Sequence, residues 1–104
     1  MALVKRRRTG TSAESIPLGV ELDRRAREVL IDARLKANLT QQELAVRLGR
    51  AQSYVSRIEN GLLSIERAQF AEIARALGED PHALFAMVIT DVMQGAAKTR
   101  GRGS

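Results

Sequence analysis

A chain of 104 residues, 44% of them hydrophobic, is long enough for one compact domain. Because it contains no cysteine and one isolated histidine, His82, it offers neither a disulfide framework nor a cysteine–histidine metal site, and no cofactor is expected. The net charge of +5 lies at the ends. Residues 20–94 contain ten basic and eleven acidic residues, so the basic pI is weak support for a nucleic-acid-binding core.

The first segment has the composition of a flexible basic arm. Residues 1–19 begin with a basic run from Lys5 to Arg8, continue through threonine, serine and glycine, and include Pro17. No apolar segment follows the basic run, and no apolar stretch approaches the roughly 20 residues of a membrane-spanning helix. The sequence therefore predicts a cytoplasmic protein without a membrane partner. The arm can bind phosphates or enter a minor groove, or its arginines can simply be solvated.

Two helices are predicted after the arm. Apolar residues recur at three- and four-residue steps from about 20 to 37, and Asn38 can adopt the left-handed conformation that ends a helix. Thr40 and Glu43 have the spacing of a capping box, which starts a short second helix that Gly49 ends. The apolar face of this second helix consists of Leu44, Ala45 and Leu48.

Three more helices follow, and no segment shows the two-residue alternation of a strand. The third runs from about Gln52 to Asn60 and is ended by Gly61. The fourth is expected to have Ser64 as its N-cap and to end at Gly78. Its expected inward positions are Ile65, Ala68, Ile73, Ala74 and Leu77.

The fifth helix is predicted to start at Pro81, because Asp80 followed by proline is a typical N-cap and first helical position. The predicted fold is all-α: a compact five-helix bundle over 20–94, followed by a flexible basic tail over 95–104.

The second and third helices are separated only by a short turn containing Gly49, which is typical of a helix-turn-helix. Val55 and Ile58 can pack the third helix against the second, and its other positions then face outward. An α-helix fits the major groove, where glutamine pairs with adenine, serine reaches several base edges and arginine binds guanine or phosphate. The polar residues that this packing exposes are Gln52, Ser53, Ser56 and Arg57.

The stretch TQQELAVRLGRAQSYVSRIENG, from Thr40 to Gly61, resembles the phage-repressor and Cro type of helix-turn-helix proteins, the lambda-repressor-like family. The similarity extends from about Ile31 to Phe85, roughly half of the chain, and includes Arg34. The resemblance implies a compact bundle of five helices, and members of the family commonly bind DNA as symmetric dimers.

Site roles carry over from the resemblance by position. It implies that Gln41 contacts a phosphate and braces the reading helix, and that Gln52 and Ser53 touch base edges. Asn60 matches an asparagine that contacts the DNA backbone. Tyr54 matches a position that contacts DNA variably, or it can cover the edge of the core. The other positions of this variable kind are Ser56 and Arg57.

Three positions depart from the family pattern. Ala51 replaces the usual serine or threonine cap of the reading helix, which costs on the order of 1 kcal/mol. Arg50 occupies a position that is often apolar, and it can reach a phosphate instead. Leu62 and Leu63 follow the reading helix where polar or basic residues are frequent, so they predict either core packing or a subunit contact.

The fifth helix carries two neighbouring apolar rows, of which one can complete the core: Leu84, Val88 and Val92 form one, and Phe85, Ile89 and Met93 form the other. The other row remains exposed unless a second chain covers it, which favours a homodimer through residues 84–93. The expected dimer interface consists of Leu84, Phe85, Val88, Ile89 and Val92.

The sequence is interpreted as a DNA-binding transcription regulator, a repressor that binds a palindromic operator as a homodimer with helix 52–60 in the major groove. In one alternative, the protein is an antitoxin or a restriction-system controller that uses the same DNA-binding domain and has a protein partner such as a toxin or antirepressor. The other is an interaction adaptor that has lost DNA binding, which Leu62-Leu63 mildly favours. No enzyme is expected, because no nucleophile–base pair, carboxylate dyad or phosphate loop is visible.

Overall fold

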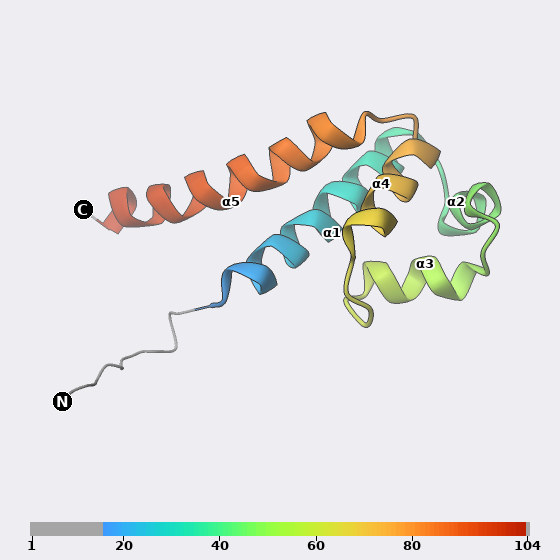
Figure 1. Ribbon diagram of the computed structural model, residues 1–104, viewed down its shortest axis with the longest axis horizontal. Helices are drawn as coiled ribbons and strands as arrows, with labels where there is room; N and C mark the ends of the chain where they lie inside the picture. Colours follow the sequence, from blue (N-terminus) through green and yellow to red (C-terminus); the bar gives the residue numbers. More distant parts are fainter. Residues whose placement is uncertain (1–15, 104) are drawn as a thin grey trace.

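Five α-helices and no strands make up the part of the chain that the computed structural model describes, namely residues 16–103 for the backbone and 16–95 for the side chains (Figure 1). The predicted all-α class and helix number are confirmed, whereas the basic run of the N-terminal arm lies outside the described residues. The helices are α1 (Leu18–Lys36), α2 (Gln41–Leu48), α3 (Gln52–Glu59), α4 (Arg67–Ala76) and α5 (Pro81–Gly103).

Local signals set the ends of the first helices as predicted. Asn38 has φ 62° just after α1, in the left-handed region that ends a helix. At the start of α2, the Glu43 amide donates to Thr40 Oγ1 at 3.0 Å, and the Thr40 amide donates to Glu43 Oε1 at 2.8 Å. This reciprocal capping box satisfies two amides that a helix start otherwise leaves unpaired.

The start of α4 differs from the prediction. Its N-cap is Glu66, whose side chain accepts from the Gln69 amide while its own amide donates to the Gln69 side chain at 2.9 Å. Ser64 stays in the preceding loop because the next amide, that of Ile65, donates to Asp23 Oδ1 of α1 at 2.8 Å and holds the chain out of the helix. Ala68 is consequently exposed rather than inward.

A single hydrophobic core joins all five helices. It is built mainly from aliphatic side chains, and its one aromatic pair is an edge-to-face contact between Phe70 of α4 and Phe85 of α5, with ring centroids 5.3 Å apart. Phe70, which sequence reasoning did not place, is 3% exposed. The core side chains are Ala26, Val29, Leu30, Ala33, Leu44, Ala45, Val55, Ile58, Phe70, Ile73, Ala74, Leu77, Leu84 and Val88.

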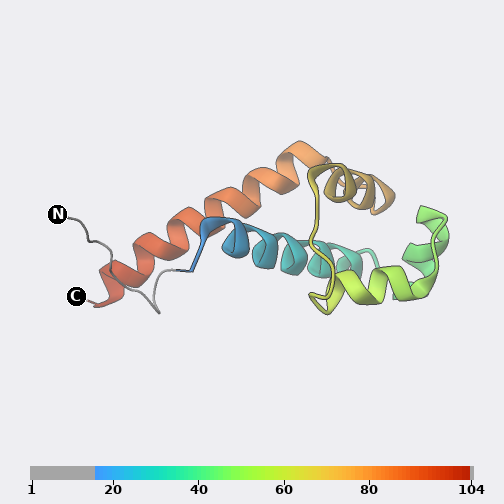
Figure 2. The same cartoon turned by 60° about the horizontal axis from the view of Figure 1, so that its bottom comes forward.

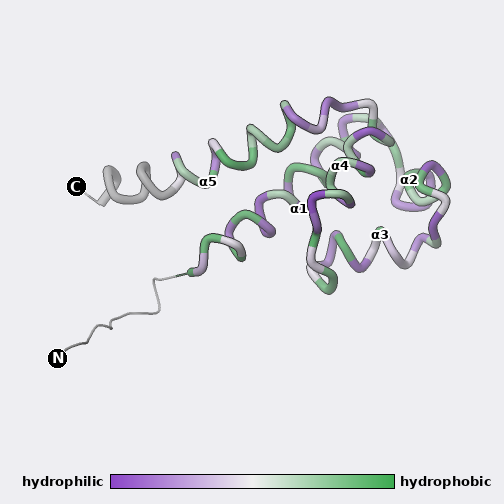
Figure 3. The backbone as a smooth tube through the Cα atoms, viewed as in Figure 1, coloured by the Kyte–Doolittle hydropathy of each residue, from purple (hydrophilic) through white to green (hydrophobic). Residues whose placement is uncertain are grey.

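The two longest helices, α1 and α5, extend away from the short helices α2 and α3, as Figures 1 and 2 both show. Hydrophobic residues continue along these extensions (Figure 3), and at the start of α1 they are exposed: Leu18 by 52% and Val20 by 56%. The helical backbone of α5 continues to Gly103, beyond the end of the domain predicted at residue 94. Among the described residues, no helix is long and apolar enough to cross a membrane.

Candidate nucleic-acid interface

The short polar helix α3 is joined to α2 by a three-residue turn. Gly49 has φ 68° in this turn, and the Arg50 amide donates to the Ala45 carbonyl at 2.9 Å. At the N-cap of α3, Ala51 supplies no side-chain hydrogen bond, as its departure from the family pattern implied. Helix α3 is therefore positioned by packing and by more distant side chains rather than by its own cap.

One narrow edge of α3 anchors it to the protein. Val55 and Ile58 are each 3% exposed and belong to the core, whereas Gln52, Ser53 and Arg57 are exposed. This division agrees with the predicted orientation of α3 at Gln52, Ser53 and Arg57, whereas Ser56, which was also expected to be exposed, is half-buried. The helix presents its first turn to solvent, where a helix in a major groove places the residues that read bases.

A nearly buried ion pair lies beneath α3. Arg34 of α1 donates from Nε to Glu59 Oε2 at 2.7 Å and from Nη2 to Glu59 Oε1 at 2.9 Å. Its remaining nitrogen, Nη1, donates to the Leu39 carbonyl at 2.7 Å. The two side chains are only 11% and 10% exposed, and such bidentate pairs fix both distance and orientation.

This ion pair withdraws two charges from the surface around α3. Arg34 and Glu59 are both nearly buried, and each neutralises the other. Sequence reasoning missed the pair because its members are 25 residues apart. The one feature of the sequence that could have pointed to this pair is that both residues lie within the stretch that resembles the family.

Two glutamines extend the ion pair to the surface. Gln41 Nε2 donates to Glu59 Oε1 at 2.8 Å, and Gln52 Nε2 donates to Gln41 Oε1 at 2.7 Å. Gln41 thus contacts the reading helix as the family resemblance implied. Gln52 still has one free N–H on that nitrogen and its carbonyl oxygen, which is the donor–acceptor pair that an adenine edge requires.

Arg50 and Tyr54 form a pair at the side of α3. The Arg50 guanidinium carbon lies 4.4 Å from the centroid of the Tyr54 ring, within the range of a cation–π contact. Tyr54 packs against the core, and its hydroxyl is buried without a hydrogen-bond partner among the described residues. The structure therefore favours the core-edge interpretation of Tyr54, with Arg50 as the more accessible polar group.

The remaining polar positions near α3 are less constrained. Asn60 is exposed and its Nδ2 donates to Ser56 Oγ at 3.2 Å, and Ser56 is half-buried. On α2, Arg47 lies four residues after Glu43 but forms no ion pair with it among the described residues. Instead its Nη1 donates to the Ala76 carbonyl at the end of α4, at 2.9 Å.

The two leucines after the reading helix have different environments. Leu62 is 71% exposed, whereas Leu63 packs against the core. Core packing therefore accounts for Leu63 alone. Leu62 leaves an exposed apolar side chain in the loop after α3.

The five residues expected at a dimer interface are divided between two environments. Leu84 and Val88 are 6% and 0% exposed, so their side chains are enclosed by their own chain. Phe85 is half-buried against Phe70, and Val92 is half-buried. Ile89 is 41% exposed and remains available to a second chain.

Comparisons with known proteins agree with this geometry. A helix-turn-helix family model matches residues 30–84, just over half of the chain. Among solved structures, the chain is similar to the XRE-family like protein from Pseudomonas syringae pv. tomato str. DC3000. The sequences are 38% identical, the TM-score is 0.64, and the match covers 66% of this chain and 84% of the other. No curated protein matches it. The chain belongs to the XRE and lambda-repressor-like helix-turn-helix family of DNA-binding transcription regulators.

Proposed function

We propose that this regulator is a repressor that binds a palindromic operator as a homodimer and reads each half-site with α3. The proposal rests on the position of Gln52. This side chain is exposed at the first turn of α3, and its Nε2 donates a hydrogen bond to Gln41 Oε1 at 2.7 Å. A base-reading side chain that is already oriented loses less conformational entropy on binding. Ser53 beside it is exposed and adds a second group for base edges.

The proposed contacts to the DNA backbone surround this pair. Gln41 has one free N–H after its bond to Glu59, and Arg50, Arg57 and Asn60 are exposed around the reading surface. Phosphate contacts of this kind position a protein on the duplex without specifying sequence. Repression then needs only occupancy of an operator that overlaps a promoter.

The homodimer is proposed from the exposed apolar residues of α5. Met87, Ile89 and Met93 are 49%, 41% and 49% exposed. A two-fold axis beside this helix would place two copies of α3 about 34 Å apart, one turn of DNA, which a palindromic operator requires. Sedimentation at micromolar concentration, with and without DNA, tests the dimer, and a strict monomer in both conditions would contradict it.

Base reading by Gln52 is tested with Gln52→Ala. After selection of the operator from random duplexes, the variant should bind that operator about 10- to 100-fold more weakly, since one bidentate pair gives roughly 1–3 kcal/mol of discrimination. Binding to a scrambled duplex should change little, because phosphate contacts dominate there. Equal losses on both duplexes would show that Gln52 does not read bases.

A further inference from the structure

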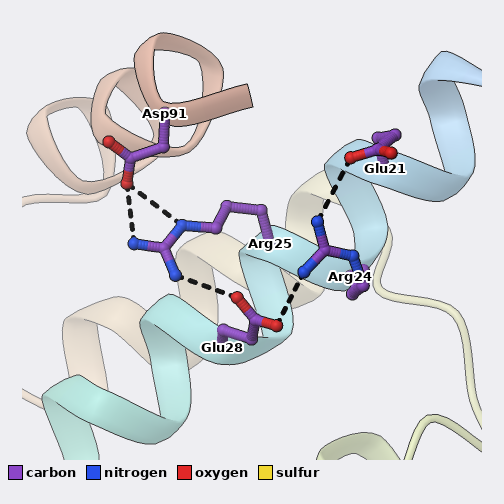
Figure 4. Close-up of polar contacts among 5 residues, drawn as sticks. All are labelled: Glu21, Arg24, Arg25, Glu28 and Asp91. Carbon is purple, nitrogen blue, oxygen red and sulfur yellow. Dashed lines mark hydrogen bonds and ion pairs between the residues drawn. The ribbon is translucent and has the colours of Figure 1, made fainter. Parts of the chain in front are cut away.

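A second charged network joins α1 to α5, on the extended part of the molecule (Figure 4). Arg25 of α1 donates from Nε and Nη2 to Asp91 Oδ2 of α5, at 3.0 Å and 2.8 Å. Its Nη1 donates to Glu28 Oε1 at 2.9 Å, so all three nitrogens of the guanidinium are engaged. The orientation of Arg25 is thus determined from two helices at once.

The rest of this network lies within α1. Arg24 donates from Nη1 to Glu28 Oε2 at 2.8 Å and from Nη2 to Glu21 Oε1 at 3.2 Å. Burial raises the pKa of Glu28, but the hydrogen bonds and charges of Arg25 and Arg24 outweigh that effect and lower the pKa overall. Glu28 therefore stays ionised and keeps its two arginine contacts at neutral pH.

The helix that carries Arg25 packs against both functional parts of the protein. α1 contacts the reading helix α3 on one side and α5 on the other. A change in the angle between α1 and α5 therefore changes the position of the reading helix relative to the exposed residues of α5. Because the 19 residues of α1 span about 28 Å, a rotation of about 10° would displace one end by roughly 5 Å. That displacement exceeds the roughly 3.4 Å rise of one base pair.

We propose that the Arg25–Asp91 contact is a positioning device that fixes the angle between α1 and α5, and with it the half-site spacing that the protein accepts. This inference rests on the homodimer proposed above. Leu84 and Val88 attach α5 to the core through apolar packing, which is non-directional and permits small rotations. The charged contact adds direction, since two donors of one rigid guanidinium converge on a single oxygen.

The side chains of Arg25 and Asp91 are 34% and 38% exposed, so their contact contributes little to overall stability. Arg25→Ala should hence leave the melting temperature and the binding to a single half-site nearly unchanged. The test uses duplexes with two half-sites whose separation is varied one base pair at a time around the selected spacing. The wild-type preference for the selected spacing over its neighbours should fall about three-fold in Arg25→Ala, a loss within the range of a partly exposed ion pair.

Three comparisons make this test specific. Asp91→Asn should weaken the spacing preference as Arg25→Ala does, and the double variant should do no more than either single one. The matched control is Arg24→Ala, which removes an equal charge but only contacts within α1, and should keep the wild-type profile. An unchanged profile in Arg25→Ala and Asp91→Asn would overturn the positioning role alone. A wild-type protein that binds two half-sites no better than one would overturn the homodimer and this inference together.

Discussion

Two arginine–carboxylate pairs that join different helices in the described part of the chain differ in burial. The Arg34–Glu59 pair under the reading helix is 11% and 10% exposed, and it is linked through glutamines to the surface. The Arg25–Asp91 pair between α1 and α5 is 34% and 38% exposed. Removing one partner of a buried pair leaves an uncompensated charge in the interior, whereas solvent replaces a partner at the surface. The buried Arg34–Glu59 pair is therefore expected to stabilise the fold, whereas the proposed role of the exposed Arg25–Asp91 pair is to set the angle between α1 and α5.

The largest effect is expected at the buried pair. Glu59→Ala leaves Arg34 charged and nearly enclosed, and should lower the free energy of unfolding by about 3–5 kcal/mol in urea titrations. It also removes the acceptor of Gln41, so operator binding should weaken under conditions where the variant remains folded. A loss of less than about 1 kcal/mol would mean that this pair behaves like an ordinary surface contact.

A double replacement separates stability from DNA binding at the same site. Arg34→Met combined with Glu59→Leu removes both charges and fills the same space with apolar side chains. Such a replacement of a whole buried ion pair often leaves the free energy of unfolding nearly unchanged. The double variant should recover most of the unfolding free energy lost in Glu59→Ala. Because Gln41 and Gln52 still lack their anchor, binding to the operator should remain weaker than in the wild type.

The next effect contrasts the two rows of α5. Leu84→Ala removes a side chain that is 6% exposed and should cost about 2–5 kcal/mol in the free energy of unfolding. Ile89→Ala, at a position 41% exposed, should cost the monomer well under 1 kcal/mol. Its expected effect is instead on the dimer, measured as a higher dissociation constant in sedimentation. A large loss of monomer stability in Ile89→Ala would show that both rows serve the core.

A smaller effect is expected at the turn before the reading helix. Gly49 has φ 68°, and beyond its two chain neighbours no described atom lies within 4 Å of the position that a β-carbon would take, so Gly49→Ala should cost about 1–2 kcal/mol through backbone strain alone. Gly49→Asn should cost less, because asparagine tolerates this conformation better. Gly19→Ala is the matched control: this glycine also has open space but lies in α1, where alanine should stabilise by up to about 1 kcal/mol. Equal changes at both positions in thermal unfolding would rule out the backbone explanation.

These contrasts show which features were predictable from the sequence. The cap formed by Thr40 and Glu43, the left-handed Asn38 and the turn at Gly49 depend on residues a few positions apart, so their spacing suffices. The exposed polar side of α3 followed from the same local pattern, with Val55 and Ile58 as its anchor.

Features that depend on contacts between distant helices were not predictable in the same way. Ser64 and Glu66 both had the chemistry of an N-cap, and the choice depended on Asp23 of α1, which accepts the Ile65 amide. The two apolar rows of α5 are equivalent in the sequence, and only packing against α1 and α4 assigns Leu84 to the core. The buried pair beneath α3 and the contact between α1 and α5 likewise join residues far apart in the chain.

The smallest effect concerns the pH dependence of the exposed network. Because its arginine partners lower the pKa of Glu28 in the folded protein, the carboxylate stabilises the fold above its ordinary pKa of roughly 4.3. That contribution is lost as the pH falls through the lower, folded pKa. Since Glu28 is 43% exposed, Glu28→Gln should cost less than about 1 kcal/mol at pH 7. The difference between the variant and the wild type in urea titrations should shrink as the pH falls below the ordinary carboxyl pKa and through the lowered pKa of the folded protein, because the wild-type carboxyl then becomes neutral as well. A difference that stays constant from pH 7 to about pH 3 would attribute the cost to packing rather than to the ionised carboxylate.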